Sequence, residues 1–173
     1  MSFKPALVDA ASDVLALART RGLSIVTAES CTSGLLASVL SESPGAAELL
    51  HGGFVTYTKQ NKTTALGVPE ELLQREGAVN AEVARAMAEG ALERSPAELA
   101  AAITGVAGPS PDEDGNPVGL VFIAVARRGF PTAYLARDYG NIGRDAVRES
   151  AIADALAALS RVARVCRSYA RVR

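Results

Sequence analysis

The chain has 173 residues, of which 49% are hydrophobic, and its 18 lysines and arginines nearly balance 19 acidic residues. This length predicts a single domain over residues 1–173, and the charge balance gives no reason to expect a nucleic-acid or membrane-surface partner. Cys31 and Cys166 are too far apart to form a metal motif or a disulfide framework, which favours a reduced, cytoplasmic setting. The sequence shows no signal peptide and no apolar run of the roughly 20 residues that a membrane helix needs.

The first predicted element is a helix that ends at Gly22. Its apolar stripe at helical spacing consists of Leu7, Ala11, Val14, Leu15 and Ala18. A short buried strand over residues 23–26 then leads into a polar turn, Thr27–Gly34. Good helix formers predict a second helix over residues 35–40, and residues 54–57 are predicted to form the second strand.

Three helices are predicted in the middle of the chain. The first covers residues 58–67, and the second opens at Pro69 and ends near Gly77. Asn80 is a typical N-cap for the third, which runs to about Arg94.

The second half of the chain begins with a buried strand over residues 99–104, followed by an irregular loop over residues 105–117. Residues 119–126 and 132–138 predict a hairpin, and a long helix starts near Arg144. Strands that alternate with helices and end in a hairpin predict a three-layer α/β/α sandwich. Its sheet is expected to be mixed, mostly parallel and built from about five strands.

The polar turn after the first strand suggests chemistry. A strand, a tight turn and a helix together bring one side chain to the carboxyl edge of a sheet and direct helix N–H groups toward it. Ser30 is the candidate nucleophile there, and the free amides of the turn could stabilise an oxyanion. The competing interpretation is that Thr32 or Ser33 is only an N-cap.

If the first two strands are neighbours, the residues after the second strand share a crevice with Ser30. Lys62 is a candidate base if burial lowers its pKa, and Tyr57 could relay or hold the proton. The alternative is a solvated helix charge and an ordinary strand aromatic. Cys31 is the rival nucleophile but lacks a histidine partner, because the only histidine, His51, is predicted to lie in a loop. This scarcity of ligands also argues against a metal site.

Two further segments are predicted near this crevice. Thr104 and Gly105 end the third strand, and their amides could face a ligand, although a turn that only needs glycine is the alternative. Arg144 and Arg148 begin the last helix after a glycine-containing segment, which suits a phosphate. The alternative for Arg148 is a solvated pair with a neighbouring acidic residue.

Five segments, taken in order, resemble the CinA C-terminal domain family. They are residues 27–34, 53–57, 104–109, 117–119 and 143–148. The similarity extends over about residues 7–160, nearly the whole chain. Each motif alone is weak, but the five in register are specific.

The resemblance implies an amidohydrolase that converts nicotinamide mononucleotide, a small-molecule nucleotide substrate, to the acid with release of ammonia. It implies no metal and no organic cofactor. Ser30 would be the nucleophile, Lys62 its base and Tyr57 a proton-handling partner, while Thr104 and Arg144 would contact the substrate. The other residues expected at the substrate are Cys31, Thr32, Ser33, Gly34 and Gly105.

The sequence departs from the family pattern at Ser33, where glycine is usual, and at Asn116, where lysine is frequent. The loop over residues 110–116 is also acidic here. These departures bear on rate and substrate fit more than on fold. Many family members carry a separate N-terminal nucleotide-binding domain, for which this chain has no room, so the stand-alone form is expected.

Two alternative functions compete with the deamidase. One is a catalytically silent domain on the same scaffold that binds a nucleotide or a partner, and the other is an amidase for a different small amide. The last helix is rich in alanine, leucine and valine, so we expect a homo-oligomer, with a dimer favoured, although core packing explains the same composition.

Overall fold

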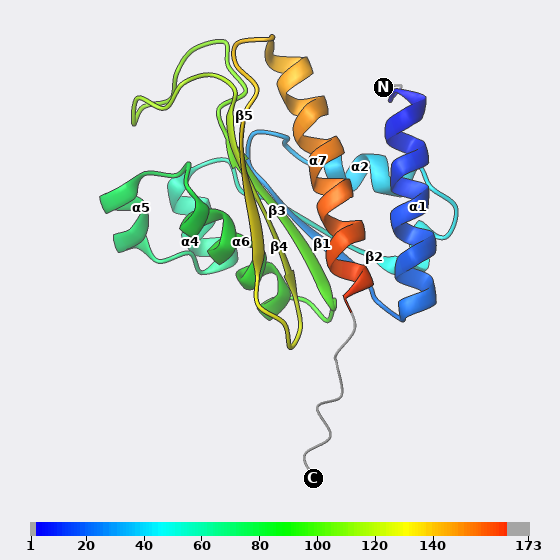
Figure 1. Ribbon diagram of the computed structural model, residues 1–173. Helices are drawn as coiled ribbons and strands as arrows, with labels where there is room; N and C mark the ends of the chain where they lie inside the picture. The colour runs from blue at the N-terminus through cyan, green and yellow to red at the C-terminus, as the bar shows by residue number, and fades with distance from the viewer. Residues whose placement is uncertain (1–2, 166–173) are drawn as a thin grey trace.

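The computed structural model describes residues 3–165 and contains a five-stranded sheet between two helical layers (Figure 1). The strands are β1 (Ile25–Glu29), β2 (Leu50–Val55), β3 (Leu99–Gly105), β4 (Leu120–Arg127) and β5 (Ala133–Asp138). They lie in the order β2-β1-β3-β4-β5. The predicted three-layer α/β/α sandwich is confirmed.

The sheet is mixed. Strand β1 pairs in parallel with β2 and with β3, whereas β3–β4 and β4–β5 are antiparallel. Every residue of β1 is buried, and β3 is buried except at its last residue. This pattern is typical of strands that are covered by helices on both faces. The expectation that the first two strands are neighbours is also confirmed.

Helices cover both faces of the sheet. One layer holds α1 (Pro5–Arg21), α2 (Leu35–Ser41) and α7 (Arg144–Arg164). The other layer holds α4 (Lys59–Leu66), α5 (Glu70–Glu76) and α6 (Ala81–Glu93), and a short helix, α3 (Ala46–Leu49), precedes β2. The five residues of the predicted stripe on α1 are all buried. No helix within residues 3–165 is long and apolar enough to cross a membrane.

Two predicted caps are confirmed. Gly22 ends α1 in a left-handed conformation (φ 62°), and its N–H donates to carbonyl oxygens of the last turn. Left-handed backbone is the usual way to end a helix at glycine. The Asn80 side chain begins α6 by accepting a 2.8 Å hydrogen bond from the Val83 amide.

The predicted limits of the first two strands are wrong. Strand β1 continues to Glu29, because Glu29 pairs with both neighbouring strands despite its polar side chain. Strand β2 begins at Leu50, so His51 lies in an edge strand and not in a loop. Gly53 belongs to the same strand, where a Cβ atom would lie 2.3 Å from Thr27 Oγ1. The glycine therefore permits close approach of β2 to β1, and does not mark a loop.

This topology positions the site. Because β1, β2 and β3 are parallel, their carboxyl ends lie at one edge of the sheet. Ser30 follows β1, Thr56 follows β2 and Gly105 ends β3. Side chains from three distant parts of the sequence therefore meet at that edge, where open α/β sheets bind ligands.

Candidate active site

The turn between β1 and α2 is built around the buried carboxylate of Glu29. Its Oε1 accepts hydrogen bonds from Thr27 Oγ1 (3.0 Å) and the Ala37 amide (2.9 Å). Its Oε2 accepts hydrogen bonds from the Gly34 and Leu36 amides, both at 3.0 Å. A carboxylate at this place accepts hydrogen bonds from free amides at the start of the helix. Its negative charge also interacts favourably with the positive end of the helix dipole.

The alternative interpretation of Thr32 or Ser33 as an N-cap is wrong. The N-cap is Gly34, and no side chain caps from that position, because Glu29 supplies the acceptor from the preceding strand. Ser33 adopts the left-handed region (φ 51°), the conformation that glycine enters freely. For a residue with a Cβ atom this conformation costs roughly 1–2 kcal/mol. Ser33 therefore places backbone strain in the turn that holds Ser30.

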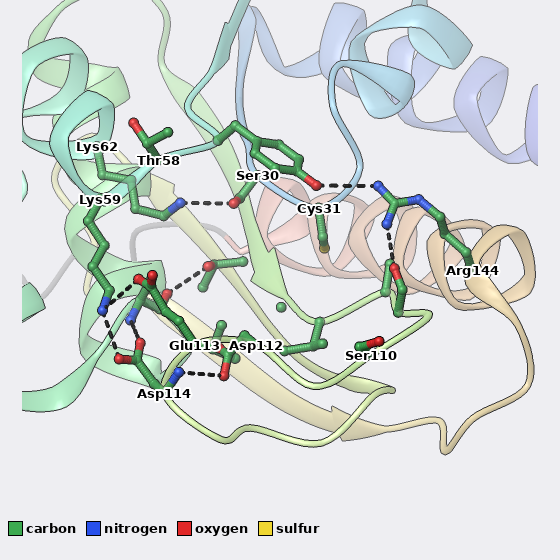
Figure 2. A pocket seen from close by; sticks show the side chains of 18 of the residues that line it. Ser30, Cys31, Thr58, Lys59, Lys62, Ser110, Asp112, Glu113, Asp114 and Arg144 are labelled. Carbon is green, nitrogen blue, oxygen red and sulfur yellow. Dashed lines mark hydrogen bonds and ion pairs between the residues drawn. The ribbon is translucent and has the colours of Figure 1, made fainter.

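Ser30 and Lys62 are in direct contact (Figure 2). Lys62 Nζ donates a 2.8 Å hydrogen bond to Ser30 Oγ and another of 2.8 Å to the Thr56 carbonyl oxygen. The lysine is only 1% exposed, and no carboxylate within residues 3–165 pairs with it. Burial lowers its pKa from 10.5 to about 8 against a small opposing effect of Cys31. A large fraction of this amine is therefore neutral near pH ~8.

Cys31 is a poorer nucleophile than its neighbour. The side chain is buried, and burial raises the pKa of its thiol to about 11. Since the thiolate is the reactive form, this cysteine stays protonated and unreactive at neutral pH. The environment favours Ser30, whose hydroxyl has the amine of Lys62 within hydrogen-bonding distance.

Most amides of the turn are already committed. Those of Ser30, Ser33 and Gly34 donate to oxygen atoms of Ile103, Ser30 and Glu29 respectively. The amides of Cys31 and Thr32 donate to no oxygen atom in the described part of the chain. These two N–H groups are the ones left to bind a developing negative charge beside Ser30.

A cavity of about 540 Å³ opens at this edge of the sheet. Its volume lies in the range of small-molecule sites. In Figure 2, Arg144 lies to one side of Ser30, and an acidic loop that contains Asp112, Glu113 and Asp114 lies on the other. The cavity can therefore accept a ligand whose charge is unevenly distributed.

The acidic loop is tied to the start of α4. Lys59 Nζ lies 2.9 Å from a Glu113 oxygen and 2.8 Å from an Asp114 oxygen. The other Asp114 oxygen accepts a hydrogen bond from the Ala78 amide at 3.3 Å. These ionic contacts partly neutralise the loop but contribute little stability because they are solvent-accessible.

Arg144 and Tyr57 form the opposite side. Arg144 donates a hydrogen bond to the Gly108 carbonyl oxygen and a long one of 3.4 Å to Tyr57 Oη. Tyr57 is 59% exposed, and its hydroxyl contacts neither Ser30 nor Lys62. The structure thus groups the tyrosine with the arginine at the cavity rim.

The structure brings together seven of the ten predicted site residues on the cavity wall. They are Ser30, Cys31, Tyr57, Lys62, Thr104, Gly105 and Arg144. Thr104 is held there by its hydroxyl, which donates to the Ala78 carbonyl oxygen at 2.7 Å. Thr32, Ser33 and Gly34 belong to the same turn as Ser30 but do not line the cavity.

Sequence reasoning missed two groups that shape the site, Glu29 and the Thr56 carbonyl. Glu29 lies five residues before Gly34, the first residue whose amide donates a hydrogen bond to it. This separation is longer than the three-residue spacing of a capping box. Thr56 acts through its backbone, which no side-chain pattern reveals. Residues 3–165 contain no group of histidine, cysteine, aspartate or glutamate side chains that could hold a metal ion.

Comparison with known proteins identifies the family of this chain. The family model for the CinA C-terminal domain matches residues 8–163. The chain belongs to the CinA C-terminal domain family. A CinA-like protein from Synechococcus sp. is 44% identical over 147 residues, which cover 84% of this chain and 35% of that protein. A CinA-like protein from Akkermansia muciniphila is 51% identical over 110 residues, 64% of this chain and 27% of that protein.

A crystal structure of the same family extends the agreement to three dimensions. The competence/damage inducible protein CihA from Agrobacterium tumefaciens superposes with a TM-score of 0.88 at 41% identity. The match covers 92% of this chain and 97% of that one. By contrast, the chain spans about a third of the length of the Synechococcus relative and less of the Akkermansia one. The CinA C-terminal fold is therefore common to chains of different length.

Replacing Glu29 by glutamine tests the carboxylate at the turn. An NH₂ group would face amide donors in place of an acceptor, so we expect the free energy of unfolding to fall by ~2–3 kcal/mol. Urea denaturation measures the loss, with Glu42→Gln at the exposed end of α2 as control, where a change within ~0.5 kcal/mol is expected. Equal stability of Glu29→Gln and the wild type would show that the carboxylate is dispensable.

Proposed function

We propose that this chain is a serine–lysine amidohydrolase that converts nicotinamide mononucleotide and water to nicotinate mononucleotide and ammonia. The observation that carries the proposal is the 2.8 Å contact between Ser30 Oγ and the buried Nζ of Lys62 on the wall of the cavity. The substrate is the one that the resemblance to the family implies, because the geometry by itself supports only acyl transfer at a small ligand.

The reaction begins with proton transfer. Neutral Lys62 accepts the hydroxyl proton as Ser30 Oγ attacks the carboxamide carbon. The Thr56 carbonyl oxygen accepts a hydrogen bond from the Lys62 amine and thereby keeps this amine directed at Ser30. A fixed base 2.8 Å from the oxygen requires no further approach to take the proton.

The tetrahedral intermediate then needs anion stabilisation. The amides of Cys31 and Thr32 are the proposed donors, because the other amides of the turn have acceptors. One such donor contributes about 3 kcal/mol to lowering the barrier. Protonated Lys62 returns its proton to the departing nitrogen, so that ammonia leaves and an acyl ester remains on Ser30.

Deacylation repeats the same steps with water as nucleophile. Water loses a proton to Lys62, attacks the ester carbon and releases the carboxylic acid, while Ser30 regains its proton. Arg144 is the proposed partner of the substrate phosphate, since a guanidinium binds phosphate oxygens in a bidentate manner. Tyr57, at the same rim, would hold the nucleotide near that arginine.

Ammonia release from nicotinamide mononucleotide tests the proposal. We expect release by the wild type without added metal and a loss of about 10³-fold or more in Ser30→Ala and in Lys62→Met. Ser38→Ala and Lys4→Met, both on the exposed surface, serve as matched controls and should keep the wild-type rate. A folded wild type that binds the nucleotide without releasing ammonia would instead favour the silent binding domain.

The pH dependence of kcat/KM follows from the lowered pKa of Lys62. Below a pKa of about 8 the amine is protonated and cannot accept the Ser30 proton, so the rate should rise with pH through that value and then level off. Initial rates between pH ~6 and pH ~10 measure the profile. A rate that is flat across this range would exclude Lys62 as the base.

A further inference from the structure

Arg148 reaches the nucleophile turn from the neighbouring helix. It lies one turn into α7, and its Nη2 donates a 3.1 Å hydrogen bond to the Thr32 carbonyl oxygen. The alternative of a solvated pair with a neighbouring acidic residue is wrong, since Glu149 pairs with Lys4 and no carboxylate of the described chain pairs with Arg148. Arg148 does not line the cavity, whereas Arg144 does.

One peptide group of the turn is held by hydrogen bonds at both its N–H and its carbonyl end. The peptide that joins Thr32 to Ser33 uses its N–H to donate to the Ser30 carbonyl oxygen at 3.1 Å. Its carbonyl oxygen accepts two hydrogen bonds, one from Arg148 at 3.1 Å and one from the Leu35 amide at the start of α2 at 3.0 Å. A charge-assisted bond from a guanidinium is stronger than one between neutral groups, so the carbonyl is held firmly toward α7.

The same peptide is adjacent to the strained residue. Ser33 has a φ of 51°, and such a backbone persists only where the surroundings hold it in place. Rotation of the peptide would relieve this strain and release the carbonyl from α7. The negative end of a carbonyl dipole would then be free to turn toward the place where the oxyanion forms.

The burial of Arg148 is not explained by stability alone. Its Nε is buried and has no hydrogen-bond partner within residues 3–165. A partly buried guanidinium without a carboxylate and with an unsatisfied N–H is unfavourable for folding. The contact with Thr32 is the one hydrogen bond that the guanidinium makes in the described chain.

We propose that Arg148 is a positioning residue for the oxyanion site. By holding the Thr32 carbonyl toward α7, it keeps the amides of Cys31 and Thr32 directed at the oxygen atom that becomes negatively charged when Ser30 attacks the carboxamide. Arg148 does not touch the substrate and acts through the turn. This inference rests on the proposed function, because it assumes that Ser30 carries out acyl transfer.

The test compares Arg148→Met with Arg148→Lys, which keeps one charged donor. Arg161→Met, an exposed arginine on the same helix, is the matched control. Each variant is assayed for kcat and KM with nicotinamide mononucleotide and for the rate at which a fluorophosphonate probe labels Ser30. Labelling needs the nucleophile and the oxyanion amides but not the natural substrate. Thermal unfolding confirms that each variant is folded.

We expect Arg148→Met to lower kcat and the labelling rate together by about 10- to 100-fold, with KM within about threefold of wild type. Arg148→Lys should recover part of the loss, and Arg161→Met should match the wild type. A folded Arg148→Met that keeps the wild-type kcat or labelling rate would overturn the positioning role and leave the proposed function standing.

The labelling assay separates the two proposals. If the wild type is labelled at Ser30 but releases no ammonia, the substrate assignment fails, and the labelling rates of the variants still decide the role of Arg148. If a folded wild type is neither labelled nor active, acyl transfer by Ser30 is excluded, and the role proposed for Arg148 is excluded with it.

Discussion

The candidate site depends on one buried carboxylate. Glu29 ends strand β1 and accepts hydrogen bonds from free amides at the start of α2, so that a single side chain joins the strand, the turn and the helix. A buried carboxylate is tolerable because four donors surround it, and the turn has its observed shape because those donors must converge. Ser30 is the next residue, so its position follows from the hydrogen bonding of Glu29. The left-handed backbone of Ser33 lies within the same constraint.

A second requirement, a lysine that is neutral in the folded protein, explains the other half of the site. The chain buries Lys62 beside a hydroxyl and a carbonyl oxygen without a carboxylate partner, an arrangement that lowers its pKa. Burying an amine in this way is unfavourable for stability and favourable for proton transfer. The neighbouring thiol of Cys31 is affected in the opposite sense, since burial raises its pKa. Burial at one site therefore favours the neutral form of both groups, the amine of Lys62 and the thiol of Cys31.

Much of this arrangement could be predicted from the sequence. Buried strands read as apolar runs, and the caps at Gly22 and Asn80 have strong local signals, so the layers of the sandwich were predictable. The sequence also predicted that Ser30 and Lys62 share a crevice if the first two strands are neighbours, because adjacent parallel strands end at a common edge.

The parts that escaped prediction act over longer range or through the backbone. Glu29 was assigned to a turn because its side chain is polar, whereas its pairing with two strands depends on tertiary structure. Arg148 was predicted at a phosphate or in a solvated pair and not at the turn, because the Thr32 carbonyl that it contacts lies 116 residues away in the sequence. Such contacts leave no periodicity in the sequence, and only the folded chain reveals them.

The protonation state of Lys62 is the central claim, and NMR tests it most directly. Lysine labelled at Nζ and Cε, titrated by NMR in the wild type and assigned with Lys62→Met, reports the pKa of this amine without any substrate. We predict a midpoint of about 8, with the neutral form dominant above it. A midpoint near the ordinary lysine value of 10.5 would contradict a neutral base at Ser30.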